Sequence, residues 1–170
     1  MDLGEQLTFW TARLAMFVYL IGLAVRFYPN RFSFTRAVWT TGCAILLLHL
    51  VCAFQFAHHW SHADAYAATA RRTGEFIGVD WGGGLYFNYA FALIWIADVL
   101  WSWLAGHSHE SRSAVIDWVV HGFLFFMAFN ATVVFATGFT RWLFLAGCLV
   151  LGGLWAWARP GFGLDRKSRL

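Results

Sequence analysis

Five ionisable side chains lie inside long apolar segments of this sequence. They are Arg13, His49, Asp98, Asp117 and His121. On insertion scales, a charged residue at the centre of a membrane-spanning helix costs about 2.5–3.5 kcal/mol. Each of the five therefore needs a partner, a route to the membrane surface or a chemical role, and each is a candidate functional residue.

Asp117 and His121 are four residues apart, so they share one face of a helix. Asp98 is expected at a similar depth in the preceding apolar segment. Carboxylates beside imidazoles can relay protons, and they can support an imidazole that binds a divalent metal. The structural alternative is a buried polar pair, in which Asp98 pairs with His121 or Arg112. The sequence predicts one of these roles for Asp98, Asp117 and His121.

His49 and His121 lie within two different apolar segments. A haem b group can be held by histidines from two helices, so this pair is a candidate cofactor-binding site. The two histidines are expected to differ in membrane depth by several ångströms, which argues against this pair. The structural alternative for His49 is a hydrogen bond to a neighbouring backbone group.

Three histidines gather after the second apolar segment. His58, His59 and His62 form the pattern H-H-x-x-H, and Asp64 follows. If the helix continues through this point, His58 and His62 lie one turn apart and could hold a transition metal together with Asp64. The alternative is a polar rim at the level of the lipid headgroups.

The composition is that of an integral membrane protein. Of 170 residues, 60% are hydrophobic, 20% aromatic and 12% charged, with a mean hydropathy of +0.58. A soluble domain carries about 25% charged residues. The composition excludes a soluble enzyme and a disordered regulator, and no dense basic run indicates nucleic-acid binding. The partner it implies is the lipid bilayer.

Five segments are long and apolar enough to span that bilayer. They cover residues 8–27, 36–57, 85–104, 114–137 and 140–158. The expected fold is all-α: a polytopic protein with one domain over residues 1–170, in which five transmembrane helices form a compact bundle. The last two spans are joined at Gly138 and are expected to form an antiparallel hairpin.

The connection over residues 58–84 is the longest. Ser61 and Asp64 resemble the start of a helix, and Gly74 is a candidate stop. We expect a short interfacial helix between them. Gly82, Gly83 and Gly84 are expected to let the chain re-enter the membrane at a free angle.

The distribution of basic residues predicts the orientation. The predicted inner side carries eight Lys and Arg residues, and the outer side carries four. The N-terminus should then lie outside and the C-terminus in the cytoplasm, and the compact build favours a bacterial inner membrane. Arg13 is expected about one turn inside the outer end of its span. It either snorkels to the interface or pairs with Glu75 or Asp80.

Three classes of function follow. The first is a metal- or haem-binding protein with redox or proton-handling chemistry at the histidines. The second is an accessory subunit of a larger membrane complex, or a homo-oligomer, for which the small residues Cys148, Gly152 and Ala156 offer a close-packing ridge. The third is a small carrier or channel, for which no broken helix at mid-membrane provides support.

Overall fold

The computed structural model describes residues 2–26 and 32–158, and all regular structure in these ranges is helical. The elements in chain order are α1 (Leu3–Val25), α2 (Phe32–Cys52), η1 (Ala53–Ala57), α3 (His62–Ile77), α4 (Gly84–Leu104), α5 (Gly106–Glu110), α6 (Ala114–Phe129), η2 (Asn130–Val134) and α7 (Phe139–Ala158), where η denotes a π-helical turn. The predicted all-α fold is confirmed.

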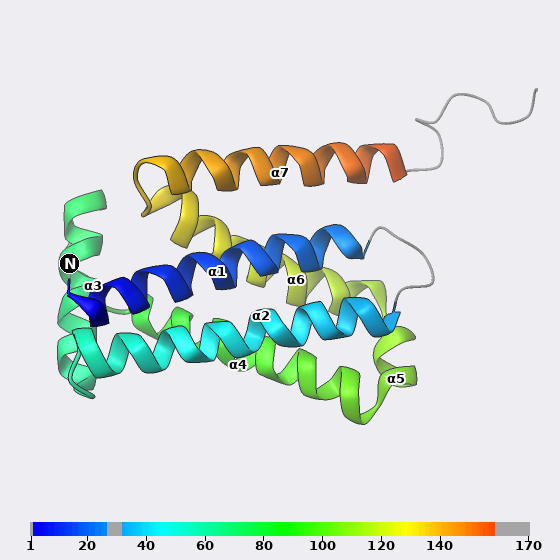
Figure 1. Cartoon of the computed structure of the whole chain (residues 1–170), viewed down its shortest axis with the longest axis horizontal. Helices are drawn as coiled ribbons and strands as arrows, with labels where there is room; N and C mark the ends of the chain where they lie inside the picture. Colours follow the sequence, from blue (N-terminus) through cyan, green and yellow to red (C-terminus); the bar gives the residue numbers. More distant parts are fainter. Residues whose placement is uncertain (1, 27–31, 159–170) are drawn as a thin grey trace, which may run out of the picture.

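Five of these segments are long and apolar enough to cross a membrane. They are Leu3–Val25, Ser33–Ala57, Gly84–Leu104, Ala114–Val134 and Phe139–Ala156, within a few residues of the predicted spans. Figure 1 shows the five segments running roughly along one direction. We take this direction as the membrane normal. The chain is therefore a multi-span membrane protein.

Helix α1 begins earlier than predicted. Asp2 accepts a hydrogen bond from the Glu5 N–H, and the Glu5 carboxylate accepts one from the Asp2 N–H. This reciprocal capping fixes the start of the helix at Leu3. Arg13 consequently lies near the middle of α1, and its predicted place one turn inside the outer end was wrong.

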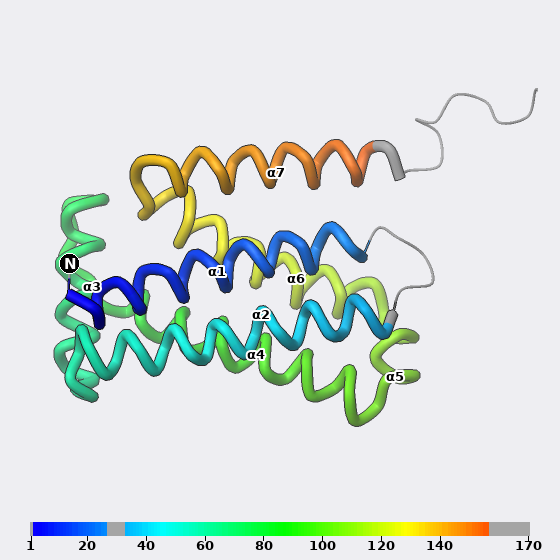
Figure 2. Tube along the Cα trace, in the orientation of Figure 1, coloured from blue at the N-terminus to red at the C-terminus, as the bar shows by residue number. Residues whose placement is uncertain are grey.

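Helix α3 lies across the ends of the spans (Figure 2). The Ser61 hydroxyl accepts the Asp64 N–H at 3.1 Å, as the predicted helix start requires. The predicted stop at Gly74 was wrong, because the helix continues to Ile77. It ends at Gly78, whose φ of 76° is the left-handed conformation that glycine adopts most readily.

The glycines before α4 serve close packing more than conformational freedom. A Cβ on Gly82 would lie 2.6 Å from the Tyr66 backbone oxygen, and one on Gly83 would lie 2.1 Å from the Trp81 ring. Neither glycine has a positive φ. The expectation of a free hinge at Gly82–Gly84 is therefore replaced by a tight contact between Tyr66, in the first half of α3, and the chain that leads into α4.

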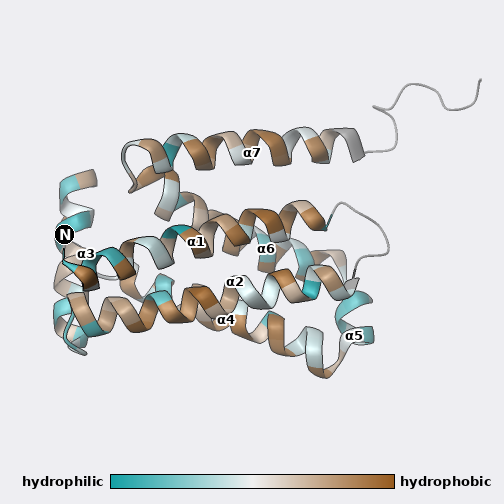
Figure 3. Ribbon diagram, viewed as in Figure 1, coloured by the Kyte–Doolittle hydropathy of each residue, from teal (hydrophilic) through white to brown (hydrophobic). Residues whose placement is uncertain are grey.

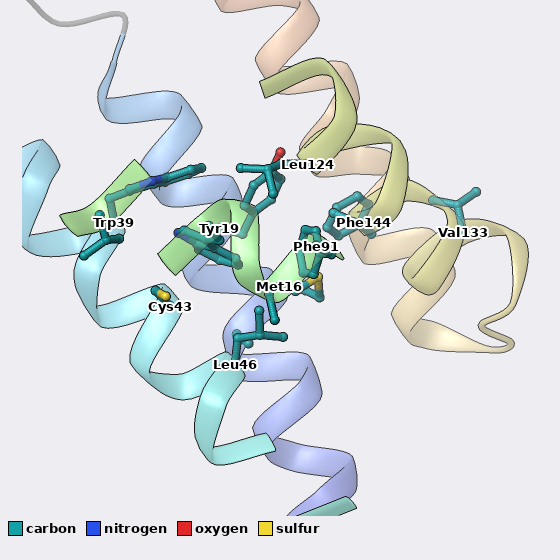
Figure 4. Close-up of a cluster of buried hydrophobic side chains, with 14 residues drawn as sticks. Met16, Tyr19, Trp39, Cys43, Leu46, Phe91, Leu124, Val133 and Phe144 are labelled. Carbon is teal, nitrogen blue, oxygen red and sulfur yellow. The ribbon is translucent and has the colours of Figure 1, made fainter. Parts of the chain in front are cut away.

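The core is formed by buried side chains of α1, α2 and α4, joined by residues of α6, η2 and α7 such as Leu124, Val133 and Phe144 (Figure 4). Its centre is aromatic: the rings of Tyr19, Trp39 and Trp95 have centroids 5.0–5.5 Å apart, and Tyr19 and Trp95 are fully buried. Such clusters gain from ring packing as well as from burial. This aromatic centre fixes the relative positions of α1, α2 and α4, which position Arg26, Trp39 and Asp98 of the polar cluster described below.

Helix α7 is the least covered span. Only 6% of its most apolar window is buried, against 33% for α4. The short turn at Gly138 joins α6 and α7 as predicted, but α7 packs on α1 and η2 rather than along the whole of α6. At Gly152, a Cβ would meet nothing within 4 Å, so the predicted ridge around Gly152 is open.

Candidate functional site

Figure 3 shows hydrophilic residues gathering at the two ends of the bundle, at α3 and at α5. The densest polar group is at the α5 end. We call it the Arg112 cluster, and it comprises Arg26 (α1), Trp39 (α2), Asp98 (α4), His109 (α5), Arg112 and, from α6, Asp117 and His121. It links every span except α7.

Asp98 is the most enclosed acid of the cluster, with its side chain 3% exposed. One carboxylate oxygen, Oδ2, accepts the indole N–H of Trp39 at 2.8 Å. The other, Oδ1, accepts a hydrogen bond from Arg112 Nη1 and lies 3.1 Å from His109 Nε2. Asp98 therefore has the Arg112 partner that the structural alternative describes.

Asp117 is the second acid, and its side chain is 37% exposed. Its Oδ1 accepts from Arg112 Nε at 2.9 Å and from Arg26 Nη2 at 2.8 Å. Arg112 also donates to it through Nη2. Arg112 therefore bridges the two carboxylates, using different edges of one guanidinium group, which is the geometry that arginine offers and lysine does not.

His121 completes the cluster. Its Nε2 faces Nη1 of Arg26 and lies 2.8 Å from Nη2 of Arg112. Guanidinium groups only donate, so Nε2 must carry the lone pair, and the ring proton is assigned to Nδ1. Nδ1 is buried and has no hydrogen-bond partner in the described part of the chain. The ring packs edge-on against Trp39, with centroids 5.2 Å apart.

The turn between α5 and α6 holds Arg112 in place. The Ser113 hydroxyl accepts the Ile116 N–H and starts α6 directly after Arg112. Burial alone would lower the pKa of the Arg112 guanidinium, but the ion pairs with Asp98 and Asp117 raise its pKa above the ordinary value. Arg112 is therefore a permanent cation, with its side chain only 4% exposed.

The charges of the cluster balance. Two guanidinium groups, from Arg26 and Arg112, face two carboxylates, from Asp98 and Asp117. A buried charge is tolerated when it is paired and hydrogen-bonded. The arrangement can therefore hold four helices together at one level of the bundle without leaving a net buried charge.

His49 lies elsewhere. Its Nδ1 is 3.0 Å from the Thr8 carbonyl oxygen and 3.5 Å from the Thr11 hydroxyl. His49 is ten residues, about 15 Å, along α2 from Trp39, which touches His121. The structure therefore does not bring His49 and His121 together, and His49 has the backbone partner expected of a structural histidine.

The outer histidines are not arranged on one helical face. The helix does not continue through them: η1 ends at Ala57, and His59 and Trp60 have positive φ values of 48° and 58°. His58 packs against the Phe54 ring, whereas His62 turns to the Tyr89 hydroxyl at 3.1 Å. The condition for placing His58 and His62 one turn apart, a helix that continues through them, is therefore not met.

Metal binding by His58, His59, His62 and Asp64 remains a prediction. Within residues 2–26 and 32–158, no three His, Cys, Asp or Glu side chains are grouped so as to hold a metal ion. Burial lowers the pKa of the His58 imidazole. Among the smaller contributions, Asp64 raises this pKa, whereas Arg71 and His59 lower it.

Arg13 takes neither of its two predicted partners. Its guanidinium group lies over the Phe9 ring, 3.6 Å from the centroid, and near Trp10 at 5.4 Å. Because Phe9 and Trp10 precede it in α1, the side chain points toward the α3 end. This is the direction that the snorkelling prediction required.

Three members of the cluster, Arg26, Trp39 and His109, were not predicted as site residues from the sequence. The sequence did carry a signal for the cations of this cluster, because two acids inside spans near one end require cations at the same end.

No protein-family model, no curated protein and no solved structure matches this chain, so its function has to be argued from its own residues.

Proposed function

We propose that this protein is a structural subunit of a membrane assembly, in which the Arg112 cluster holds the bundle in one arrangement rather than performing catalysis. The observation that carries the proposal is that both carboxylates are already engaged by hydrogen-bond donors of other side chains. Asp98 and Asp117 each accept hydrogen bonds from at least two other side chains, with Arg112 common to both.

A proton relay needs a carboxylate that can take up and release a proton. Close guanidinium groups favour the charged carboxylate, because an opposite charge within a few ångströms stabilises it. A metal site would likewise need the oxygens and imidazole nitrogen that the two arginines occupy. These contacts support the buried-pair role among the alternatives for Asp98, Asp117 and His121.

The uncovered surface of α6 and α7 supports the second half of the proposal. Large apolar side chains along these helices are strongly exposed, among them Trp118 and Val119 on α6 and Trp142 and Leu149 on α7. Lipid can cover such residues, but the open Gly152 also allows another helix to approach closely. We propose the α6–α7 side as the side that faces a partner subunit.

The test is purification of the full chain from its own membrane in a mild detergent, followed by mass measurement of the intact particle. The proposal expects a second membrane protein, or a second copy of this chain, in a fixed ratio. A monodisperse monomer that carries only lipid and detergent would overturn it. Leu149→Trp, which adds bulk beside Gly152, should weaken the assembly, whereas Leu100→Trp on α4 should not.

Metal or haem binding is the second candidate, with redox chemistry at His58, His59 and His62 or at His49 and His121. The clustering of the three outer histidines in the sequence favours it. An absorption spectrum and elemental analysis of the purified protein decide the matter. A Soret band or stoichiometric iron, copper or zinc would support this function, and the absence of both would remove it.

A carrier or channel has the least support. Between the Arg112 cluster and the α3 end, the centre of the bundle is filled by apolar and aromatic residues such as Met16, Leu46 and Phe91. A polar path through the membrane would have to pass this layer.

A further inference from the structure

Among the described residues, Arg13 is a cation that has no anionic partner. The charges of the Arg112 cluster balance one another, but Arg13, which lies within a predicted span, forms no ion pair with any described residue; its contacts there are the rings of Phe9 and Trp10. A positive charge in this position attracts an anionic group from the surroundings.

Arg13 lines a pocket between α1, η2 and α7. The cavity has a volume of about 280 Å³ and an almost entirely apolar wall, formed by side chains such as Leu14, Phe17, Leu143 and Phe144. Thr140 also lines this pocket, and its hydroxyl oxygen is buried without a hydrogen-bond partner among the described residues. The pocket therefore has an apolar wall, one cation and, on a lining residue, one hydroxyl without a hydrogen-bond partner among the described residues.

The level of the pocket in the membrane can be inferred from the aromatic residues. Trp10 on α1 and Trp142 at the start of α7 are 61% and 69% exposed, and tryptophan concentrates where the hydrocarbon meets the headgroups. Arg141 lies beside Trp142 in the first turn of α7. Arg13, whose side chain points toward this end, can therefore reach phosphate groups, while the apolar wall extends into the hydrocarbon.

We propose that the α1–α7 pocket binds one anionic phospholipid of the surrounding membrane, with an acyl chain along Leu14, Phe17 and Leu143 and the phosphate group at Arg13. The Thr140 hydroxyl, which lacks a partner among the described residues, is a candidate donor to an ester or phosphate oxygen. Charge complementarity selects an anionic lipid, and the narrow apolar volume suits a flexible chain. This proposal does not depend on the proposed subunit role.

The test uses photoactivatable lipids with a diazirine on the acyl chain. The full chain is reconstituted in vesicles that contain the phosphatidylglycerol or the phosphatidylcholine form, and labelled peptides are mapped by mass spectrometry. The proposal expects several-fold more labelling of residues 139–144 and 14–20 from the phosphatidylglycerol form. Equal labelling by both lipids, or labelling spread evenly over all spans, would overturn it.

Variants separate the headgroup contact from general effects. Arg13→Gln should remove the preference for phosphatidylglycerol, and Arg13→Lys should retain most of it. Arg71→Gln, which removes an exposed charge on α3, should leave the preference unchanged. If Arg13→Gln keeps the preference, or if residues 139–144 are protected from both lipids by a second copy of the chain, the proposal is wrong.

Discussion

The indole N–H of Trp39 donates a 2.8 Å hydrogen bond to Oδ2 of Asp98, joining α2 to α4 inside the bundle. Both residues are at most 5% exposed. The opposite oxygen of the same carboxylate binds Arg112, so Asp98 is held from two sides by groups that only donate. This relationship ties the aromatic core to the charged cluster.

Trp39→Phe keeps an aromatic ring in the core and removes the indole donor. A hydrogen bond to a charged group contributes about 1.5–3 kcal/mol, so the free energy of unfolding should fall by about that amount. Denaturant titration in micelles measures it. Trp103→Phe is the matched control, because the Trp103 indole donates to the neutral Thr40 hydroxyl on an exposed surface, and it should cost less than about 1 kcal/mol. Equal losses for both variants would contradict this account of Trp39.

Asp117→Asn should lower the free energy of unfolding by less than a substitution of Asp98 does. The Arg26–Asp117 pair is partly exposed, at 30% and 37%, so solvent screens its charges. We expect a loss of about 1 kcal/mol in the free energy of unfolding, and a smaller loss at high salt concentration. A loss that is large and independent of salt would show that Asp117 is more enclosed than the structure has it.

The fold and the site differed in how much the sequence revealed. Length and hydropathy located all five spans, because the bilayer imposes one requirement on every spanning helix. The Asp98–Arg112 pair was predictable because an in-span acid needs a cation. The roles of Arg26 and Trp39 were not, because they depend on how α1 and α2 rotate about their axes, and residues far apart in the sequence decide that. The turn at His59 and Trp60, likewise, has no strong local signal.

The orientation of the chain gives a prediction that labelling can check. In a background without Cys43, Cys52 and Cys148, single cysteines are placed by Ala67→Cys on α3 and Ser108→Cys on α5, both at exposed positions. The distribution of basic residues predicts that α5 lies on the cytoplasmic side. A membrane-impermeant maleimide should label position 67 in intact cells and position 108 only after lysis. The reverse pattern would invert the predicted topology.

His58 should titrate below the ordinary histidine value of about 6.5. Its pKa is lowered, first by burial against neighbours such as Phe54. The folded state then binds fewer protons than the unfolded state, so this group weakens folding as the pH falls below about 6.5. Ring-nitrogen NMR titration measures the pKa directly, with His58→Asn used to assign the signal. A value above 6.5 would contradict the packing described for this ring.

The most direct test of the structural role of the Arg112 cluster is a double-mutant cycle on Asp98→Asn and Arg112→Gln, with unfolding free energies measured in micelles. Each single change removes one charge of the buried Asp98–Arg112 pair and should cost about 3–5 kcal/mol. The double variant should cost less than the sum by about 1–3 kcal/mol. Two small and additive losses would contradict the account, because they would mean that the Arg112 cluster does not hold the helices together.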